Sequence, residues 1–405
     1  MALVDMKDLL NHAYHNSYAV GAFEIVSLDF LKAVIKAAED SRSPVILNVN
    51  DRKGKIKNLD LLMAGVERAA RISTVPVAIN FDHCATSDDI VNGIRLGCNC
   101  VMLDASDASF PINVDRTKKA ATLSHSCGVP VEGSLGHVSS VDSQDNTSEN
   151  AGPVLTPIHE VAVYIERTSV DFLAISIGTK HGRMQSKNKL DFNRLAKING
   201  AAKIPLVIHG GTGLTDNQYH KLIDNGVAKI NYFTALTEQA METLKETIQD
   251  SQFGYMELFE QIRESIYNEV KRCMQVWRST GRAAEVLIQC NLWHNVEHVI
   301  ACNSESGDEK QIQQMVLRGK NDLSRIPGVM NIKVGKSTTE EGKYEYCWII
   351  RLANQSVVST LNNNPVYLSF ANSILRDQSP EKPRINYEML NEVDLEPALL
   401  IASHA

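Results

Sequence analysis

The sequence lacks the features that direct a protein to a membrane or to nucleic acid. No apolar run approaches the roughly 20 residues needed to span a bilayer. The opening segment MALVDMKDLLNHAYHN has no basic stretch followed by an apolar core, as a signal peptide would have. No basic stripe or arginine-rich tract is present, and the net charge of -7 is mild. We therefore expect a cytoplasmic protein whose partners include neither nucleic acid nor a membrane.

The cysteines form no recognisable disulfide framework. They are scattered along the chain, and several lie inside apolar segments, which is typical of buried thiols in a reducing cytoplasm. Cys98 and Cys100 form a CxC pair that could bind a metal or act in redox chemistry, but this motif alone is weak, and buried thiols are favoured.

The length of 405 residues exceeds what one ordinary core supports, and the composition is that of a globular protein. Up to about residue 280, eight short β-rich runs alternate with longer patterns whose apolar residues recur at three and four. This alternation predicts an α/β protein with a parallel sheet, and eight repeats favour a closed (β/α)8 TIM barrel. A doubly wound open sheet is the alternative, but no GxGxxG opens a helix after the first run. The predicted strands are 18–23, 44–50, 75–81, 100–103, 129–133, 171–177, 204–210 and 228–233.

Three histidines stand at the ends of three of these runs: His83 in VAINFDHC, His181 in FLAISIGTKHG and His209 in IPLVIHGGTG. The carboxyl ends of barrel strands converge on one mouth, where three neutral imidazoles can hold a zinc ion and leave one coordination position open. A lone histidine at a strand end is more often structural, but here three agree. The pattern predicts a metal-dependent lyase.

Glycine-rich turns follow two of the same runs. In HGGTGL (209–214) and GTKHG (178–182), the glycines allow the backbone to approach a ligand and to aim N–H groups at an anion. The alternative is that they only permit tight turns. The hydroxyl groups of Thr212 and Thr234 favour phosphate binding.

Six segments, taken in order, resemble the motifs of the class II, zinc-dependent fructose- and tagatose-bisphosphate aldolases. The resemblance covers essentially residues 1–280, including the opening AVGAFE. The segments are PVAINFDHC, VMLDASD with FPINV, VPVEGSLG, LAISIGTKHG, PLVIHGGTGL and AKINYFT.

The resemblance implies reversible C–C bond cleavage of a phosphorylated ketose, such as a ketose bisphosphate, through a metal-stabilised enediolate. His83, His181 and His209 would be the zinc ligands, and Asp104 would support a second or alternative position for a divalent or monovalent cation. Asp82 would exchange a proton with the substrate hydroxyl; the alternative is that it only orients an imidazole. The implied phosphate cradle and ketose contact are Gly182, Gly210, Gly211, Thr212, Thr234 and Asn231.

Several positions depart from the family pattern around the sugar. Family members usually have Asn at Glu24, Ser at Asn50, a metal-binding Glu at Ser134, and Asn or Asp at Phe233. The mobile loop that carries a GG-x-ED acid in the family is GHVSSVDSQDNTSENAG here, so only Asp142, Asp145 and Glu149 could replace that acid.

Three functions therefore stay open at this point. The protein is an aldolase with a rebuilt loop, a C–C lyase or transferase with a changed acceptor, or a non-catalytic metal-binding dimer.

After residue 282 the pattern changes to βαββαβ, the order of a ferredoxin-like α+β unit. His298, IPGV (326–329) and NNNPVYLSFANSIL resemble the stress-responsive dimeric α/β-barrel domain over about residues 294–390, which implies a homodimer or a higher homo-oligomer. His298 is as compatible with a core position as with ligand binding. We predict a barrel over 1–282, the small domain over 283–395 and a tail over 396–405.

Overall fold

The computed structural model describes residues 2–50, 58–138, 154–184, 189–249, 254–303, 309–338, 344–374 and 384–388. Eight parallel strands pair in sequence order, and the first strand also pairs with the eighth, so the sheet closes into a barrel. The predicted TIM barrel is confirmed. Its strands are β1 (Val20–Glu24), β2 (Val45–Val49), β3 (Val77–Cys84), β4 (Cys100–Leu103), β5 (Val131–Leu135), β6 (Phe172–Ile175), β7 (Leu206–Ile208) and β8 (Val227–Tyr232).

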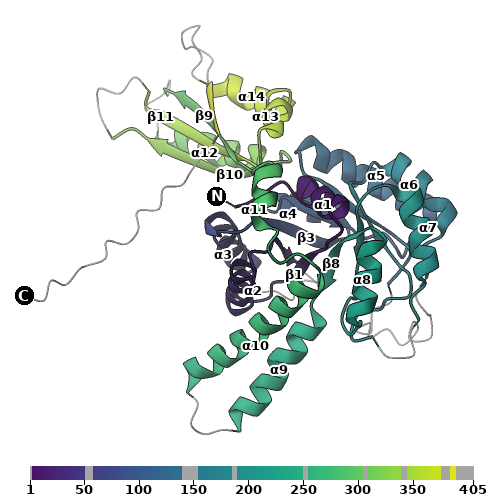
Figure 1. Ribbon diagram of the computed structural model, residues 1–405. Helices are drawn as coiled ribbons and strands as arrows, with labels where there is room; N and C mark the ends of the chain where they lie inside the picture. Colours follow the sequence, from purple (N-terminus) through teal and green to yellow (C-terminus); the bar gives the residue numbers. More distant parts are fainter. Residues whose placement is uncertain are drawn as a thin grey trace, which may run out of the picture.

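Helices alternate with the strands and cover the outside of the barrel (Figure 1). They are α2 (Leu28–Asp40), α3 (Leu59–Ile72), α4 (Ser87–Arg95), α5 (Phe110–Ser126), the 3-10 turn η2 (Ile158–Glu160), α6 (Val161–Thr168), α7 (Phe192–Ala202), α8 (Asp216–Asp224), α9 (Thr234–Ile248) and α10 (Tyr255–Val276).

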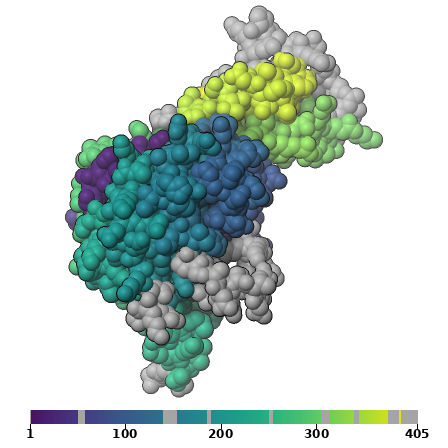
Figure 2. Space-filling view, turned by 90° about the vertical axis from the view of Figure 1, so that its right-hand side faces the viewer, coloured from purple at the N-terminus to yellow at the C-terminus, as the bar shows by residue number. Residues whose placement is uncertain are grey.

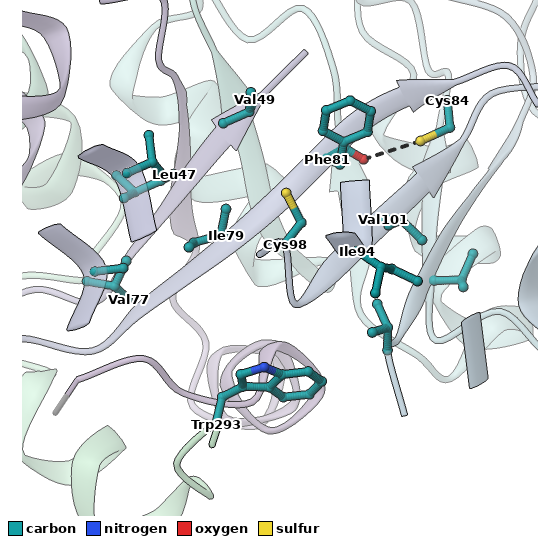
Figure 3. Packing of buried hydrophobic residues seen from close by; sticks show 14 of the residues in the cluster. Leu47, Val49, Val77, Ile79, Phe81, Cys84, Ile94, Cys98, Val101 and Trp293 are labelled. Atoms are coloured by element: carbon teal, nitrogen blue, oxygen red, sulfur yellow. Dashed lines mark hydrogen bonds between the residues drawn. The ribbon is translucent and has the colours of Figure 1, made fainter. Parts of the chain in front are cut away.

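The strands alternate between outward and inward side chains. On β3, Val77, Ile79 and Phe81 belong to the large cluster that packs under the helices (Figure 3). Ala78 belongs to a separate inner cluster, and Asn80 and Asp82 share its side of the strand because successive residues point to opposite faces. Polar residues at inward positions thus mark the part of the barrel interior that is not packed with apolar side chains.

Helix α1 (Met6–His15) closes the amino-terminal end of the barrel. Asp5 caps it by accepting bonds from the backbone N–H groups of Lys7 and Asp8, which satisfies donors that the first turn leaves open. The buried face of α1 packs in the inner cluster with residues such as Ile46 and Phe172. The barrel interior at the amino-terminal end of the strands is therefore an apolar core.

Two parts project from the barrel on opposite sides, as Figures 1 and 2 show. One is the hairpin of α9 and α10; the buried residues of α10 (Ile266, Val270, Cys273 and Met274) all lie in its carboxyl-terminal half. The other is the carboxyl-terminal domain. No helix within the described ranges is both long and apolar enough to cross a membrane.

The carboxyl-terminal domain is a four-stranded sheet in the order β10-β11-β9-β12, with every pair antiparallel. The small α+β domain is thereby confirmed, while its membership of the dimeric α/β-barrel family stays a prediction. His298 is buried between the Tyr367 hydroxyl, at 2.6 Å, and the Asn386 side chain, at 2.5 Å, as expected of a satisfied core histidine. The elements are β9 (Val296–Cys302), α12 (Glu309–Leu323), β10 (Val329–Lys336), β11 (Tyr346–Leu352), α13 (Ser356–Asn362), α14 (Pro365–Ile374) and β12 (Arg384–Glu388).

This domain contacts the barrel at the carboxyl-terminal ends of the outer helices. Asn354 donates to the Cys127 carbonyl after α5 at 2.6 Å, and Arg71 of α3 bonds to Asn295. Outer helices run opposite to the strands, so these contacts lie at the end of the barrel away from the strand carboxyl ends.

Helix α11 (Ala283–Gln289) lies after the predicted boundary, yet its Val286 packs in the inner cluster with α1. The boundary at 282/283 stays a prediction, and the predicted tail at 396–405 lies outside the described residues.

Candidate active site

The three predicted histidines come together at the carboxyl-terminal mouth of the barrel. His83, His181 and His209 each offer a ring nitrogen, and these nitrogens lie within 4.8 Å of one another. Their ring centroids are 5.0 to 6.0 Å apart. Three imidazoles at this spacing fit a divalent cation that keeps an open position for a substrate.

An irregularity in β3 brings two adjacent residues to the site. The pairing of β3 with β4 shifts register between Phe81 and Cys84, and His83 has a φ of 55°. Neighbouring residues of a regular strand point to opposite faces, whereas a bulge re-aims a side chain. Asp82 and His83 therefore both belong to the mouth. A non-glycine residue at positive φ stores backbone strain, which is frequent at functional sites.

Asp82 is buried and held by two amides. The Asn48 and Asn231 side chains each donate to its Oδ2 at 2.9 Å, and the same oxygen lies 3.6 Å from His83 Nε2. Burial by itself would raise the pKa of Asp82, but the electrostatic effect of His83, His209 and Lys229 and the bond from Asn48 hold the pKa below its usual value. The carboxylate is thus ionised and oriented, as a proton acceptor requires.

Two carboxylates lie behind two of the histidines. Asp104 Oδ2 is 3.0 Å from His83 Nδ1, and Glu132 Oε1 is 2.9 Å from His209 Nε2. These bonds leave Nε2 of His83 for a cation, and also Nδ1 of His209, which the Asn231 amide nitrogen approaches at 3.3 Å. Burial acts to raise the pKa of Asp104, but its bonds to His83 and Ser106 lower it overall.

Asp104 was predicted to support a second or alternative cation position, and Ser134 to stand where the family has a metal-binding Glu. Among the described residues, Asp104 is not part of the group of close ligand atoms, and its Oδ1 accepts bonds from Ser106 N and the Ser134 hydroxyl. Both residues line a cavity of about 20 Å³ beside the histidines, large enough for one water molecule. A metal-binding role for Asp104 stays a prediction.

Sequence reasoning missed the ion pair beneath the site. Lys229 of β8 and Glu132 of β5 are fully buried, and Lys229 Nζ lies 2.5 Å from Glu132 Oε2. Burial opposes the charge on each residue, but their mutual attraction outweighs burial: the pKa of Glu132 is lowered and that of Lys229 is raised. The sequence feature that could have indicated this pair is a charged residue inside each of two apolar runs, VPVEG and AKINYF.

A cavity of about 450 Å³ opens beside the histidines, within the range of small-molecule sites. Most of the predicted residues line it; Asn50 is buried but is not in its wall. Asn48, Arg183, Tyr232, Thr237 and Glu238 also line it and were not predicted. The predicted lining residues are Glu24, Asp82, His83, His181, Gly182, His209, Gly210, Gly211, Thr212, Asn231, Phe233 and Thr234.

The predicted phosphate cradle forms one wall of this cavity. Gly210 has a φ of 71°, and a Cβ there would lie 2.2 Å from the Lys180 carbonyl oxygen, so only glycine fits. The Tyr219 hydroxyl donates to the Gly211 carbonyl at 2.6 Å and holds the turn. Thr234 is the first residue of α9, whose open N–H groups favour an anion. The candidate loop acids Asp142, Asp145 and Glu149 lie outside the described residues.

A closed parallel barrel with a polar cavity at the carboxyl ends of its strands defines the class of TIM-barrel enzymes. A family profile described as fructose-bisphosphate aldolase class-II matches residues 4–282. The chain belongs to the class II fructose-bisphosphate aldolase family.

Individual relatives agree with this assignment. The chain is 32% identical over 286 residues to the sulfofructosephosphate aldolase of Alkalicoccus urumqiensis, covering 70% of this chain and 99% of the relative. It is 33% identical over 289 residues to the probable fructose-bisphosphate aldolase of Bacillus subtilis, covering 70% and 100%. Among solved structures, the YdjI aldolase of Escherichia coli K12 aligns with a TM-score of 0.63 at 31% identity, covering 69% of this chain and 99% of that one. These relatives support a lyase of the aldolase type in carbohydrate metabolism.

Proposed function

We propose that the protein is a zinc-dependent aldolase that reversibly cleaves or forms a C–C bond of a phosphorylated ketose. The observation that carries the proposal is the cluster of His83, His181 and His209 with Asp82 beside it. One Zn²⁺ would be held by the three histidines, and Asp104 would support a second divalent or monovalent cation. The cation would polarise the ketose carbonyl and stabilise the enediolate left by cleavage.

The chain's own residues supply binding and proton transfer. Glycines 182, 210 and 211, with Thr212 and Thr234, would hold the substrate phosphate, and Asn231 would contact the ketose end. Asp82 would take the proton of the substrate hydroxyl at the bond that breaks, and return it in the synthetic direction. The Asn48 and Asn231 amides would keep the receiving oxygen in place.

The test combines metal analysis with a partial reaction. Purified protein should contain one zinc equivalent per site and should exchange a proton of dihydroxyacetone phosphate with solvent. A chelator should abolish exchange without unfolding the protein, and His83→Ala should lose the metal. Exchange that a chelator leaves unchanged would refute the zinc mechanism. Metal binding without any exchange would instead favour a non-catalytic metal-binding dimer.

A changed acceptor is a second candidate, because Glu24 and Phe233 line the cavity. The relatives also support this candidate, because two of nearly equal identity to this chain are named for different substrates. A panel of aldehydes offered with dihydroxyacetone phosphate would decide between the candidates. Glyceraldehyde 3-phosphate as the preferred acceptor would support the ordinary aldolase, and preference for another aldehyde the changed one.

We also propose that the protein forms a homodimer or a higher homo-oligomer through the carboxyl-terminal domain. The support is its antiparallel sheet, whose Glu297, Val299 and Ala301 alternate with the fully packed residues of β9 and stay half-buried. Light scattering should give a multiple of the 44.8 kDa chain mass. A mass of one chain would refute the assembly.

A further inference from the structure

The buried pair of Lys229 and Glu132 continues into the candidate cation site. Lys229 Nζ contacts Glu132 Oε2 at 2.5 Å, and the other carboxylate oxygen, Oε1, is 2.9 Å from His209 Nε2. Lys229 lies on β8, Glu132 lies on β5 and His209 directly follows β7, so the chain of contacts crosses the barrel interior. All three side chains are 3% exposed or less.

The arrangement determines which nitrogen of His209 carries the hydrogen and which keeps its lone pair. A neutral imidazole has one N–H, and a carboxylate can only accept; Nε2 therefore carries the hydrogen and Nδ1 keeps the lone pair. Rotation of the ring would break the bond to Glu132, whose side chain is fully buried. Such a loss is costly for a buried carboxylate.

Lys229 has a separate effect on Glu132. A carboxylate with one buried partner can still turn about its terminal bond, but here both oxygens are engaged. A second group of residues, Asp82, Glu132 and His209, also has ligand atoms close enough together to hold a cation. The Lys229 ammonium already contacts the Glu132 carboxylate of this group, and so supplies a positive charge there itself.

His83 offers an internal comparison. Its partner Asp104 is 29% exposed at the side chain and is held by hydroxyl and backbone donors, not by a cation. The support behind His209 is therefore the more rigid of the two.

We propose that Lys229 and Glu132 are positioning residues of the cation site: Lys229 fixes the Glu132 carboxylate, which holds His209 so that its Nδ1 keeps the lone pair that a cation needs. This inference rests on the proposed three-histidine site. It assigns to the pair a role beyond closing the barrel core, because a core pair alone would leave cation affinity unchanged when replaced by a neutral pair of similar size.

The test uses the full chain and Co²⁺ as a spectroscopic probe of the cation site. Lys229→Met alone leaves a buried carboxylate unpaired and can prevent folding. The decisive variant is therefore the double change Lys229→Met with Glu132→Gln, which removes both charges and keeps their volume. Lys119→Met, which breaks the exposed pair with Asp115, is the matched control.

The double variant should fold, as judged by circular dichroism and thermal midpoint, and should bind Co²⁺ about 10- to 100-fold more weakly with an altered visible spectrum. The control should match the wild type. Wild-type affinity and spectrum in the folded double variant would overturn the inference. Failure of the wild type itself to bind Co²⁺, or binding that survives His83→Ala, would instead refute the three-histidine site.

Discussion

The two ends of the barrel interior are built from the same eight strands but differ in chemistry. The carboxyl-terminal end carries polar groups such as Asp82 and His209, and the Glu132–Lys229 ion pair lies beneath them, all buried. The amino-terminal half carries apolar side chains such as Ala78 and Phe172, and α1 covers it. The difference shows that a few residues along one strand separate the part that stabilises the fold from the part that binds.

The physical reason for this division is the cost of burying charge. Each buried ion loses hydration worth several kcal/mol, which a partner only partly recovers. Burial of apolar side chains in the amino-terminal half offsets that cost, because it contributes about 25 cal/mol for each Å² of apolar surface removed from water. If this comparison holds, changes at the carboxyl-terminal end of the barrel interior will affect binding and catalysis. Changes at the amino-terminal end will affect stability.

The largest effect is expected for Asp82→Asn. Removing the proposed acceptor of the hydroxyl proton should slow cleavage of the phosphorylated ketose by about 10²- to 10⁴-fold. Cation binding should persist, because the three histidines remain. Asp171→Asn is the matched control: this carboxylate is also buried but lies directly before β6, at the other end of the barrel. Equal loss of cleavage in both variants would contradict the comparison.

Phe172→Ala tests whether the amino-terminal half of the barrel interior stabilises the fold. The ring is fully buried in the inner cluster, so its removal should lower the free energy of unfolding by about 3–5 kcal/mol. Denaturant unfolding measures this value, and Ile288→Ala, at a side chain that is 84% exposed, should change it by no more than about 0.5 kcal/mol. A folded Phe172→Ala protein that no longer binds cation would show that the two halves are coupled.

The contacts of Asp171 also predict that its contribution to the free energy of unfolding depends on pH. Asp171 accepts from Lys7 Nζ at 2.8 Å, His125 Nε2 at 2.7 Å and Val131 N at 2.8 Å. Burial acts to raise the pKa of Asp171, but these bonds lower the pKa below its usual value. Its contribution is therefore present above the unfolded-state pKa near 4 and is lost as the pH falls through the lower folded pKa.

At pH 7 the Asp171→Asn variant should lose about 2 kcal/mol of unfolding free energy. Below pH 4 the difference from wild type should shrink, as measured by denaturant unfolding across pH. A difference that stays constant with pH would exclude the ionised carboxylate as its source.

The smallest effect is expected for Tyr219→Phe. Losing the bond to the Gly211 carbonyl should loosen the phosphate cradle and cost about 1 kcal/mol of substrate binding, or roughly fivefold in KM. The value of kcat should change less than KM, and Co²⁺ affinity should not change. A fall in kcat alone would indicate that Tyr219 acts on the chemical step rather than on the cradle.

Much of the fold and site was predictable from local patterns. The eight apolar runs correspond to the eight strands, and three histidines at run ends were sufficient to predict the cluster. Glu132 and Lys229 were visible as charges inside apolar runs, but their pairing was not, because 97 residues separate them. Asn48 was likewise missed, since nothing local to β2 shows that its amide contacts Asp82 on β3.

The sequence by itself determined the barrel, the family and the residue types at its mouth, because strand period and motif order are local properties. Tertiary structure alone decided three further features: the bulge that turns His83 inward, the carboxylate behind each of two imidazoles, and the ammonium that fixes one of those carboxylates. The reason is that closing the barrel brings distant strands together, and only then does burial force each charged group to have a partner.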